Sequence, residues 1–154
     1  MTTTLESQFC TFTVAGLDFG VEVDHVQEVL RHQEMTPVPR STAAIHGLIN
    51  LRGQIVTALD LRSRLGLPPR EDDVPAMNVI VRNHGEVISL LVDDIGDVID
   101  TGDRSLEPVP GTVPPTIQHA VKGVIALSGS LLLILDPDRA VDVPPATPTP
   151  GGTP

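Results

Sequence analysis

One stretch of the sequence predicts the fold: Gly47-Leu48-Ile49-Asn50-Leu51-Arg52-Gly53-Gln54-Ile55-Val56-Thr57-Ala58-Leu59-Asp60. Apolar residues lie on both sides of Arg52-Gly53, as expected for two strands that meet at a tight turn. A glycine at the second turn position allows the positive φ that such a turn needs. The pattern therefore predicts an antiparallel hairpin.

The same pattern occurs again, 123 − 47 = 76 residues later, as Gly123-Val124-Ile125-Ala126-Leu127-Ser128-Gly129-Ser130-Leu131-Leu132-Leu133-Ile134-Leu135-Asp136. A second pair of similar segments, Val21–Val29 and Leu90–Val98, is related by an offset of 90 − 21 = 69 residues. These matches indicate an internal duplication. Duplicated halves usually pack about a pseudo-two-fold axis, with a groove or a shared core between them.

The composition excludes several classes of protein. The chain has 154 residues and 40% hydrophobic side chains but only three Phe and no Trp or Tyr, so its core is expected to be aliphatic and rich in strands. A net charge of −10 and the scarcity of aromatic residues exclude nucleic acid as a partner. Cys10 cannot form an internal disulfide, which favours a reducing compartment. With no apolar run of about 20 residues and no secretory core in Met1–Gln8, we expect a soluble cytoplasmic protein.

Other segments extend the same plan. Residues 1–8 and the Pro/Thr/Gly-rich tail 143–154 offer little to bury and are expected to be disordered. Asp60 and Asp136 are expected to cap short helices, and 68–75 is expected to link the two halves. The remaining expected segments are strands at Phe9–Val14 and Phe19–Val23, a hairpin of Met77–Arg82 with Glu86–Val92, and an irregular loop at Gly102–Pro115.

A family resemblance follows from these residues. The turn Asn50-Leu51-Arg52-Gly53, the Ile-Val-x-x-Leu-Asp-Leu-Arg segment after it and the upstream Val26–Val29 resemble a CheW-type chemotaxis coupling domain, from about Phe9 to Val141. The resemblance implies a mainly β fold of two pseudo-symmetric five-stranded SH3-like barrels that share a core, with a few short helices. The domain is expected at 9–142, with the first barrel mainly at 19–66, the second mainly at 77–135, and strands exchanged between them.

The resemblance also implies a function. Such domains are non-catalytic adaptors that couple methyl-accepting chemoreceptors to a histidine autokinase in a two-component chemotaxis-type array. We expect a stand-alone coupler, because the sequence contains no kinase, phosphotransfer or receiver domain. The expected location is the cytoplasm, with recruitment to membrane-associated receptor arrays and no need for a cofactor.

The resemblance assigns residues to two surfaces. Receptor binding, at the tip of the receptor's helical hairpin, is assigned to Val26, Glu28, Arg52, Ile95 and Val98. Kinase binding, through the kinase's homologous regulatory domain, is assigned to the strands around Gly47 and Gly123. Each assignment has a structural alternative: Arg52 and Glu28 as solvated charges, the apolar residues as core, and the glycines as sites of tight backbone geometry.

The rival function is hydrolysis. Asp100-Thr101-Gly102 contains the triplet of aspartic proteases, in which two carboxylates share a proton and activate water. A single copy needs a homodimer, and Asp103 adds a like charge beside the supposed catalytic group. The alternative is a turn, which these residue types favour. The histidines at 25, 32, 46, 84 and 119 lack the spacing of metal ligands, so no metal site is expected.

Overall fold

The part of the chain that the structure describes is mainly β, as predicted. The computed structural model describes residues 8–31, 33–37, 45–69, 71, 75–83, 85–102 and 104–141, so the two expected disordered ends lie almost wholly outside the described residues. The strands are β1 (Gln8–Val14), β2 (Leu17–Glu22), β3 (Val26–Leu30), β4 (Thr36–Pro37), β5 (Ile45–Leu51), β6 (Gln54–Asp60), β7 (Met77–Asn83), β8 (Glu86–Val92), β9 (Asp94–Asp100), β10 (Val121–Leu127) and β11 (Ser130–Leu135). The helical elements are the 3-10 turn η2 (Val23–His25), α1 (Leu61–Arg64), α2 (Pro115–Ala120) and α3 (Pro137–Val141).

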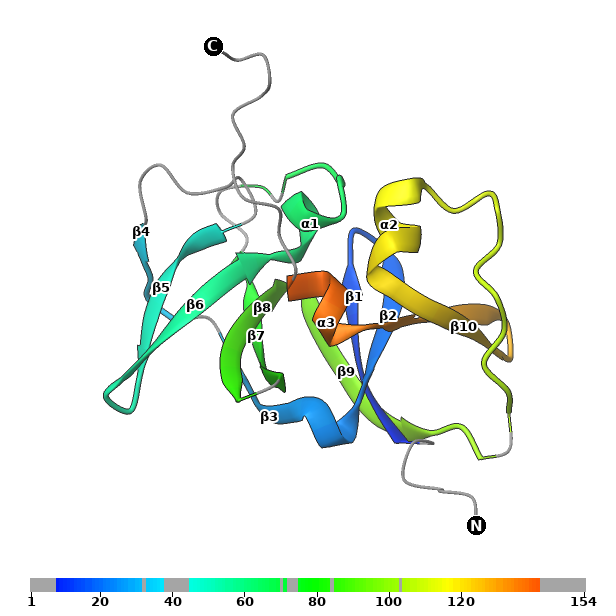
Figure 1. Cartoon of the computed structure of the whole chain (residues 1–154), viewed down its shortest axis with the longest axis horizontal. Helices are drawn as coiled ribbons and strands as arrows, with labels where there is room; N and C mark the ends of the chain where they lie inside the picture. The colour runs from blue at the N-terminus through cyan, green and yellow to red at the C-terminus, as the bar shows by residue number, and fades with distance from the viewer. Residues whose placement is uncertain are drawn as a thin grey trace.

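Each of the two sheets combines strands from both halves of the sequence. One has the order β10-β11-β2-β1-β9, and the other has the order β3-β7-β8-β6-β5-β4 (Figure 1). The two halves thus exchange their first hairpins, β1–β2 and β7–β8. The expected barrels at 19–66 and 77–135 allowed for such an exchange without naming the strands, which are β1–β2 and β7–β8. The exchange arises because η2 and the single residue Asp93 carry the chain directly into the other sheet, so each first hairpin stays behind.

The duplicated hairpins have the same register. In β5–β6 the pairing shifts between Ile45 and Gly47, and in β10–β11 it shifts between Val121 and Gly123. The offset is 121 − 45 = 76 residues, the same as in the sequence. Even the irregularity of the first hairpin is therefore repeated in the second.

The contacts between hairpins repeat as well. Thr57 of β6 lies opposite Ile88 of β8 in a parallel pairing. Leu133 of β11 lies opposite Phe19 of β2, also in parallel. The offsets, 133 − 57 = 76 and 88 − 19 = 69, are the two offsets found in the sequence, so the structure confirms the duplication.

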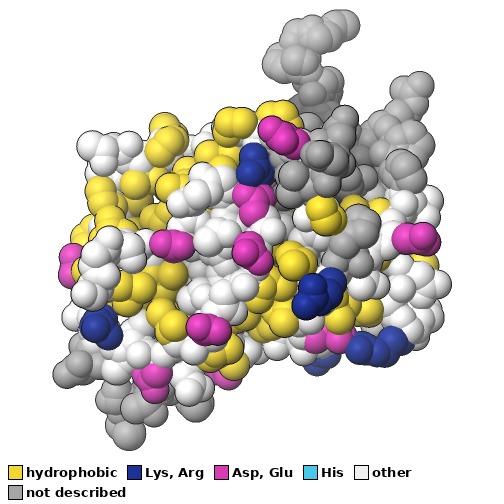
Figure 2. Space-filling model, turned by 180° about the vertical axis from the view of Figure 1, so that it is seen from behind, with side chains coloured by type: hydrophobic (Ala, Val, Ile, Leu, Met, Phe, Trp, Pro, Cys, Tyr) yellow, Lys and Arg dark blue, Asp and Glu magenta, His cyan; other side chains and the backbone are white. Residues whose placement is uncertain are grey.

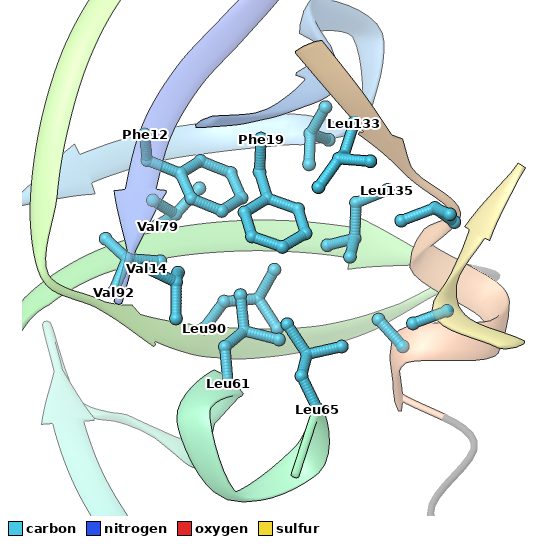
Figure 3. Packing of buried hydrophobic residues seen from close by; sticks show 14 of the residues in the cluster. Phe12, Val14, Phe19, Leu61, Leu65, Val79, Leu90, Val92, Leu133 and Leu135 are labelled. Atoms are coloured by element: carbon cyan, nitrogen blue, oxygen red, sulfur yellow. The ribbon is translucent and has the colours of Figure 1, made fainter. Parts of the chain in front are cut away.

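A single hydrophobic cluster joins the two sheets (Figure 3). At its centre the rings of Phe12 and Phe19 stack with centroids 5.9 Å apart, and Leu61 of α1 and Leu65, which follows this helix, point toward the same cluster. Removing either ring would cost about 3–5 kcal/mol of stability. The other strand residues of the cluster are Val14, Val21, Leu59, Val79, Val81, Leu90, Val92, Val121, Val124, Leu133 and Leu135. The shared core of the predicted fold is thus present.

The two predicted helix caps form at equivalent positions. Asp60 Oδ1 accepts a hydrogen bond from the backbone N–H of Arg62 at 3.1 Å, and Asp136 Oδ1 accepts one from that of Asp138 at 3.0 Å. Each bond satisfies a donor that the first turn of a helix leaves without an intrahelical partner. Both hairpins therefore end in a capped helix.

Gly47 and Gly123 also play the same structural part in the two halves. A Cβ atom added at Gly47 would lie 2.7 Å from the backbone oxygen of Thr36, and one added at Gly123 would lie 2.7 Å from that of Glu107. At both places an extended segment pairs with the strand, through Thr36 and Leu48 or through Glu107 and Val124. Only a residue without a side chain fits beneath this backbone.

We predict that Gly47→Ala and Gly123→Ala each lower the free energy of unfolding by about 1–3 kcal/mol, because the added methyl group meets backbone that cannot turn aside. Gly111→Ala is the control, since no heavy atom outside Gly111 and its two neighbours in the chain lies within 4 Å of the added Cβ. Urea denaturation of the three variants measures the effect. Equal stability of all three would contradict this explanation of the two glycines.

Candidate functional site

The tip of the β5–β6 hairpin, like the β1–β2 turn at Ala15-Gly16, places a non-glycine residue at positive φ. Arg52 and Gly53 both have positive φ, 53° and 86°, and the side-chain oxygen of Asn50 accepts a hydrogen bond from the backbone N–H of Gly53 at 2.9 Å. Positive φ values at both central residues favour Asn-Gly or Gly-Gly over an arginine. The chain therefore keeps an arginine where turn geometry favours another residue, which points to a role for its side chain.

The guanidinium of Arg52 binds Glu28 of β3 with two hydrogen bonds. Its two terminal nitrogens donate to the two carboxylate oxygens, at 2.5 and 2.7 Å. The side chain of Arg52 is 68% exposed and that of Glu28 is 19% exposed. Hydrogen bonding to Arg52 lowers the pKa of Glu28, and the same contact raises the pKa of Arg52. The pair thus displays a fixed, charged arginine at the surface.

The second half has no equivalent of this pair. The residue that corresponds to Arg52 is Ser128 (52 + 76), and the one that corresponds to Glu28 is Asp97 (28 + 69). Serine cannot form the charged, two-bonded contact, so the duplicated fold carries this site on one side only. The asymmetry distinguishes the β5–β6 tip from the β10–β11 tip.

The predicted apolar residues of the receptor site have two kinds of environment. Val26 and Ile95, related by 95 − 26 = 69, are each partly buried against the shared core, just after the chain enters β3 and β9. Val98 is 59% exposed on β9. Val29, its counterpart (98 − 69), is 40% exposed; it is not among the predicted residues, although the same offset identifies it.

The structure brings some of the predicted residues together. Glu28 and Arg52 are in direct contact, and Glu28 lies in the same strand as Val26. Ile95 and Val98 lie together in β9, an edge strand of the other sheet. The predicted site therefore spans both sheets, with its charged pair on the β3 side.

The two glycines assigned to kinase binding are both buried. Among the described residues, the exposed large apolar side chains of their hairpins are Ile55 and Leu131, which are 61% and 45% exposed and are equivalent to each other (131 − 55 = 76). Figure 2 shows that hydrophobic side chains reach the surface on both barrels in the view from behind. Each hairpin therefore presents an apolar side chain that could meet a protein partner.

The triplet of the rival hydrolase forms a turn. The Asp100 carboxylate accepts a hydrogen bond from the backbone N–H of Gly102 at 2.9 Å, Thr101 is buried, and Gly102 has a φ of 64°. Turn geometry therefore accounts for all three residue types. Among the described residues there is no group of three or more His, Cys, Asp or Glu side chains arranged to hold a metal ion. Nor does any helix of that part of the chain have the length and apolarity to span a membrane.

Comparisons with known proteins agree with this geometry. A family model described as CheW-like domain matches residues 8–144. Chemotaxis protein CheW of Rhizobium meliloti (strain 1021) is 28% identical over 131 residues, which cover 85% of this chain and 84% of that protein. Protein FrzA of Myxococcus xanthus is 41% identical over 140 residues, which cover 81% and 78%.

A solved structure is similar as well. The crystal structure of the scaffolding protein TtCheW from Thermoanaerobacter tengcongensis matches with a TM-score of 0.75 and 28% sequence identity, over 85% of this chain and 89% of that one. The predicted fold, two SH3-like barrels with a shared core, is thereby confirmed.

Fold and site together define a two-barrel β protein whose distinctive surface is suited to binding. The chain belongs to the CheW-like domain family. Neither the relatives nor the turn at Asp100 supports the hydrolase alternative.

We predict that the pKa of the Glu28 carboxyl lies below its ordinary value of about 4.3 and rises toward it in Arg52→Ala. Because the folded-state pKa is lowered, the stabilisation from this pair is present above about pH 4.3 and is lost as the pH falls through the folded-state value. NMR titration of the side-chain carboxyl carbon measures both values. Identical values in the two proteins would show that Arg52 does not hold the carboxylate in solution.

Proposed function

We propose that this chain is a non-enzymatic adaptor that holds a chemoreceptor and a histidine autokinase at the same time. The observation that carries the proposal is the Arg52–Glu28 pair, built at an unfavourable turn position and in one half only. Membership of the CheW-like family supports the class of partner. The proposal has two parts, one for each partner.

The receptor part uses the surface around the charged pair. Arg52 and Glu28 form its edge, and Val26, Ile95 and Val98 supply apolar contact to the tip of the receptor's helical hairpin. A preformed ion pair presents the arginine in one orientation, so little side-chain freedom is lost on binding. The exposed charge provides specificity, and the apolar side chains provide the burial.

The kinase part uses the duplicated hairpins. Gly47 and Gly123 are buried, so we assign them an indirect role: they let β5 and β10 lie close beneath their crossing segments and so set the shape of the hairpins. The contact itself is assigned to exposed apolar side chains of the hairpins, such as Ile55 or Leu131, which would meet the homologous domain of the kinase.

Coupling of this kind needs no chemistry in the adaptor. If each partner binds one arrangement of the complex better, the adaptor transmits the difference as a change in the population of kinase states. Modest affinities suffice, because clustered receptors raise the effective concentration. Recruitment to receptor arrays follows from receptor binding and needs no membrane-spanning segment in this chain.

We predict that Arg52→Asn weakens capture of a receptor cytoplasmic fragment by about tenfold or more, because a charged contact at an interface is lost. Asparagine suits the positive φ at this position, so the melting temperature should change by no more than about 2 °C. Capture of the kinase should be unchanged. Surface plasmon resonance with each partner, beside thermal unfolding of the free variant, measures all three quantities.

Two controls complete this experiment. Arg139→Gln removes an exposed arginine paired with Asp136 at 3.6 Å and should leave receptor capture unchanged. Asp100→Asn should leave both captures unchanged, and wild type should show no peptidase activity. Unfolding of Arg52→Asn in parallel with its loss of binding would make Arg52 structural. Peptidase activity that disappears in Asp100→Asn would favour the hydrolase.

A further inference from the structure

The chain passes twice from one sheet to the other, and the two crossings differ. The first crossing is η2, which contains Asp24, and the second is Asp93, between β8 and β9. The two aspartates are equivalent, since 93 − 24 = 69. Asp24 is exposed, whereas the side chain of Asp93 is only 19% exposed. The second crossing is therefore the more enclosed of the two.

Asp93 joins three elements of the fold. Two nitrogens of Arg62, in α1, donate hydrogen bonds to the carboxylate of Asp93: Nε to Oδ1 at 2.9 Å and Nη2 to Oδ2 at 2.6 Å. The backbone N–H of Ala15, in the β1–β2 turn, donates to Oδ2 at 2.7 Å, and the N–H of Asp93 itself donates to the carbonyl of Thr13 at 2.9 Å. Charged, two-bonded contacts with little exposure to water are the strong ones. One side chain thus ties the barrel of β3–β8 to the hairpin β1–β2 of the other barrel.

The first crossing cannot contain the same pair. The residue equivalent to Arg62 is Asp138 (62 + 76), so the corresponding positions hold two carboxylates, Asp24 and Asp138. Like charges do not form a salt bridge. Arg62 is in addition fixed from the other side, because its Nη1 donates to the carbonyl of Pro68 at 2.8 Å. The two-bonded ion pair, which we call the joint, therefore forms at the second crossing and not at the first.

Further bonds attach α1 to the other barrel. Arg64 donates Nε to the carbonyl of Ala140 at 3.0 Å and Nη2 to that of Arg139 at 2.7 Å, both in α3. Thr116 of α2 donates its hydroxyl to the carbonyl of Leu65 at 2.7 Å. Figure 1 shows α1 beside the junction of the two barrels. The helix that carries Arg62 is thus held against the other barrel by several hydrogen bonds.

We infer that Arg62 is a positioning residue, which holds Asp93 and thereby fixes how the two barrels lie relative to each other. Ile95 follows Asp93 by two residues and packs against the shared core, so the same joint sets the start of β9. A second step rests on the proposed function. Because Ile95 and Val98 are assigned there to receptor binding, Arg62 also aligns these two side chains for the receptor. Arg62 itself does not touch the receptor.

The test measures the distance between the barrels directly. Spin labels are placed at Gln54 and Ser130, exposed and equivalent positions in the two barrels (130 − 54 = 76), in a Cys10→Ala background. Asp93→Asn keeps an oxygen for the N–H of Ala15 but loses the charge that Arg62 binds. We expect a broader distribution of electron–electron distances than in the wild type. Receptor capture should fall about fivefold with kinase capture retained.

A matched control and a milder variant complete the test. Glu22→Gln neutralises a carboxylate that pairs with Lys122 at 3.2 Å within one barrel, beside the first crossing, and should leave the distance distribution and receptor capture as in the wild type. Arg62→Lys keeps the charge without the two-bonded geometry and should give an intermediate distribution. If the distance distributions of Asp93→Asn and Arg62→Lys both match that of the wild type, the inference that Arg62 and Asp93 fix the arrangement of the barrels is wrong. A broadened distribution with unchanged receptor capture would overturn only its link to receptor binding.

Discussion

The structure depends on one constraint: each half of the chain contributes its first hairpin to the sheet of the other half. Neither half can therefore complete a barrel by itself. Phe12 and Phe19, in β1 and β2, stack in the same cluster that holds Leu90 of β8 and Leu133 of β11. Because this core belongs to both barrels, we expect them to fold and unfold as one unit. The shared core keeps the two barrels together, and the Arg62–Asp93 pair sets how the proposed receptor surface, which spans both, is aligned.

Duplication would normally give two equal surfaces, whereas an adaptor needs two different ones. The symmetry is broken at two ion pairs, Arg52–Glu28 and Arg62–Asp93. Their counterparts, Ser128 with Asp97 and Asp138 with Asp24, cannot form such pairs. Substitutions at a few positions therefore suffice to give one pseudo-symmetric fold a charged edge on one side and a fixed joint at one crossing. The paired hairpins keep the same backbone register, and these two differences between the halves lie in the side chains.

Local features of the fold could be predicted from the sequence, but its long-range pairings could not. The hairpin at Arg52-Gly53 and the cap at Asp60 follow from residue types within a few positions of one another. Nothing local says which sheet receives β1–β2, because a hairpin's pattern is the same in either sheet. The contact of Arg52 with Glu28 joins residues that are 24 positions apart in the sequence, and it depends on where β3 lies in the sheet. Helix α2 was not predicted, because the irregular loop was expected to run as far as Pro115, yet Pro115 suits the first helical position.

In the proposed function, one chain holds receptor and kinase together on separate surfaces. The most direct measurement is a saturation titration followed by light scattering coupled to size separation. Receptor cytoplasmic fragment is first saturated with this protein, and the kinase's regulatory domain is then added. We predict a single complex whose mass rises to that of all three components, with the receptor fragment still bound. Release of receptor fragment in proportion to the added kinase domain would contradict the claim, because it would show that the two partners compete for one surface.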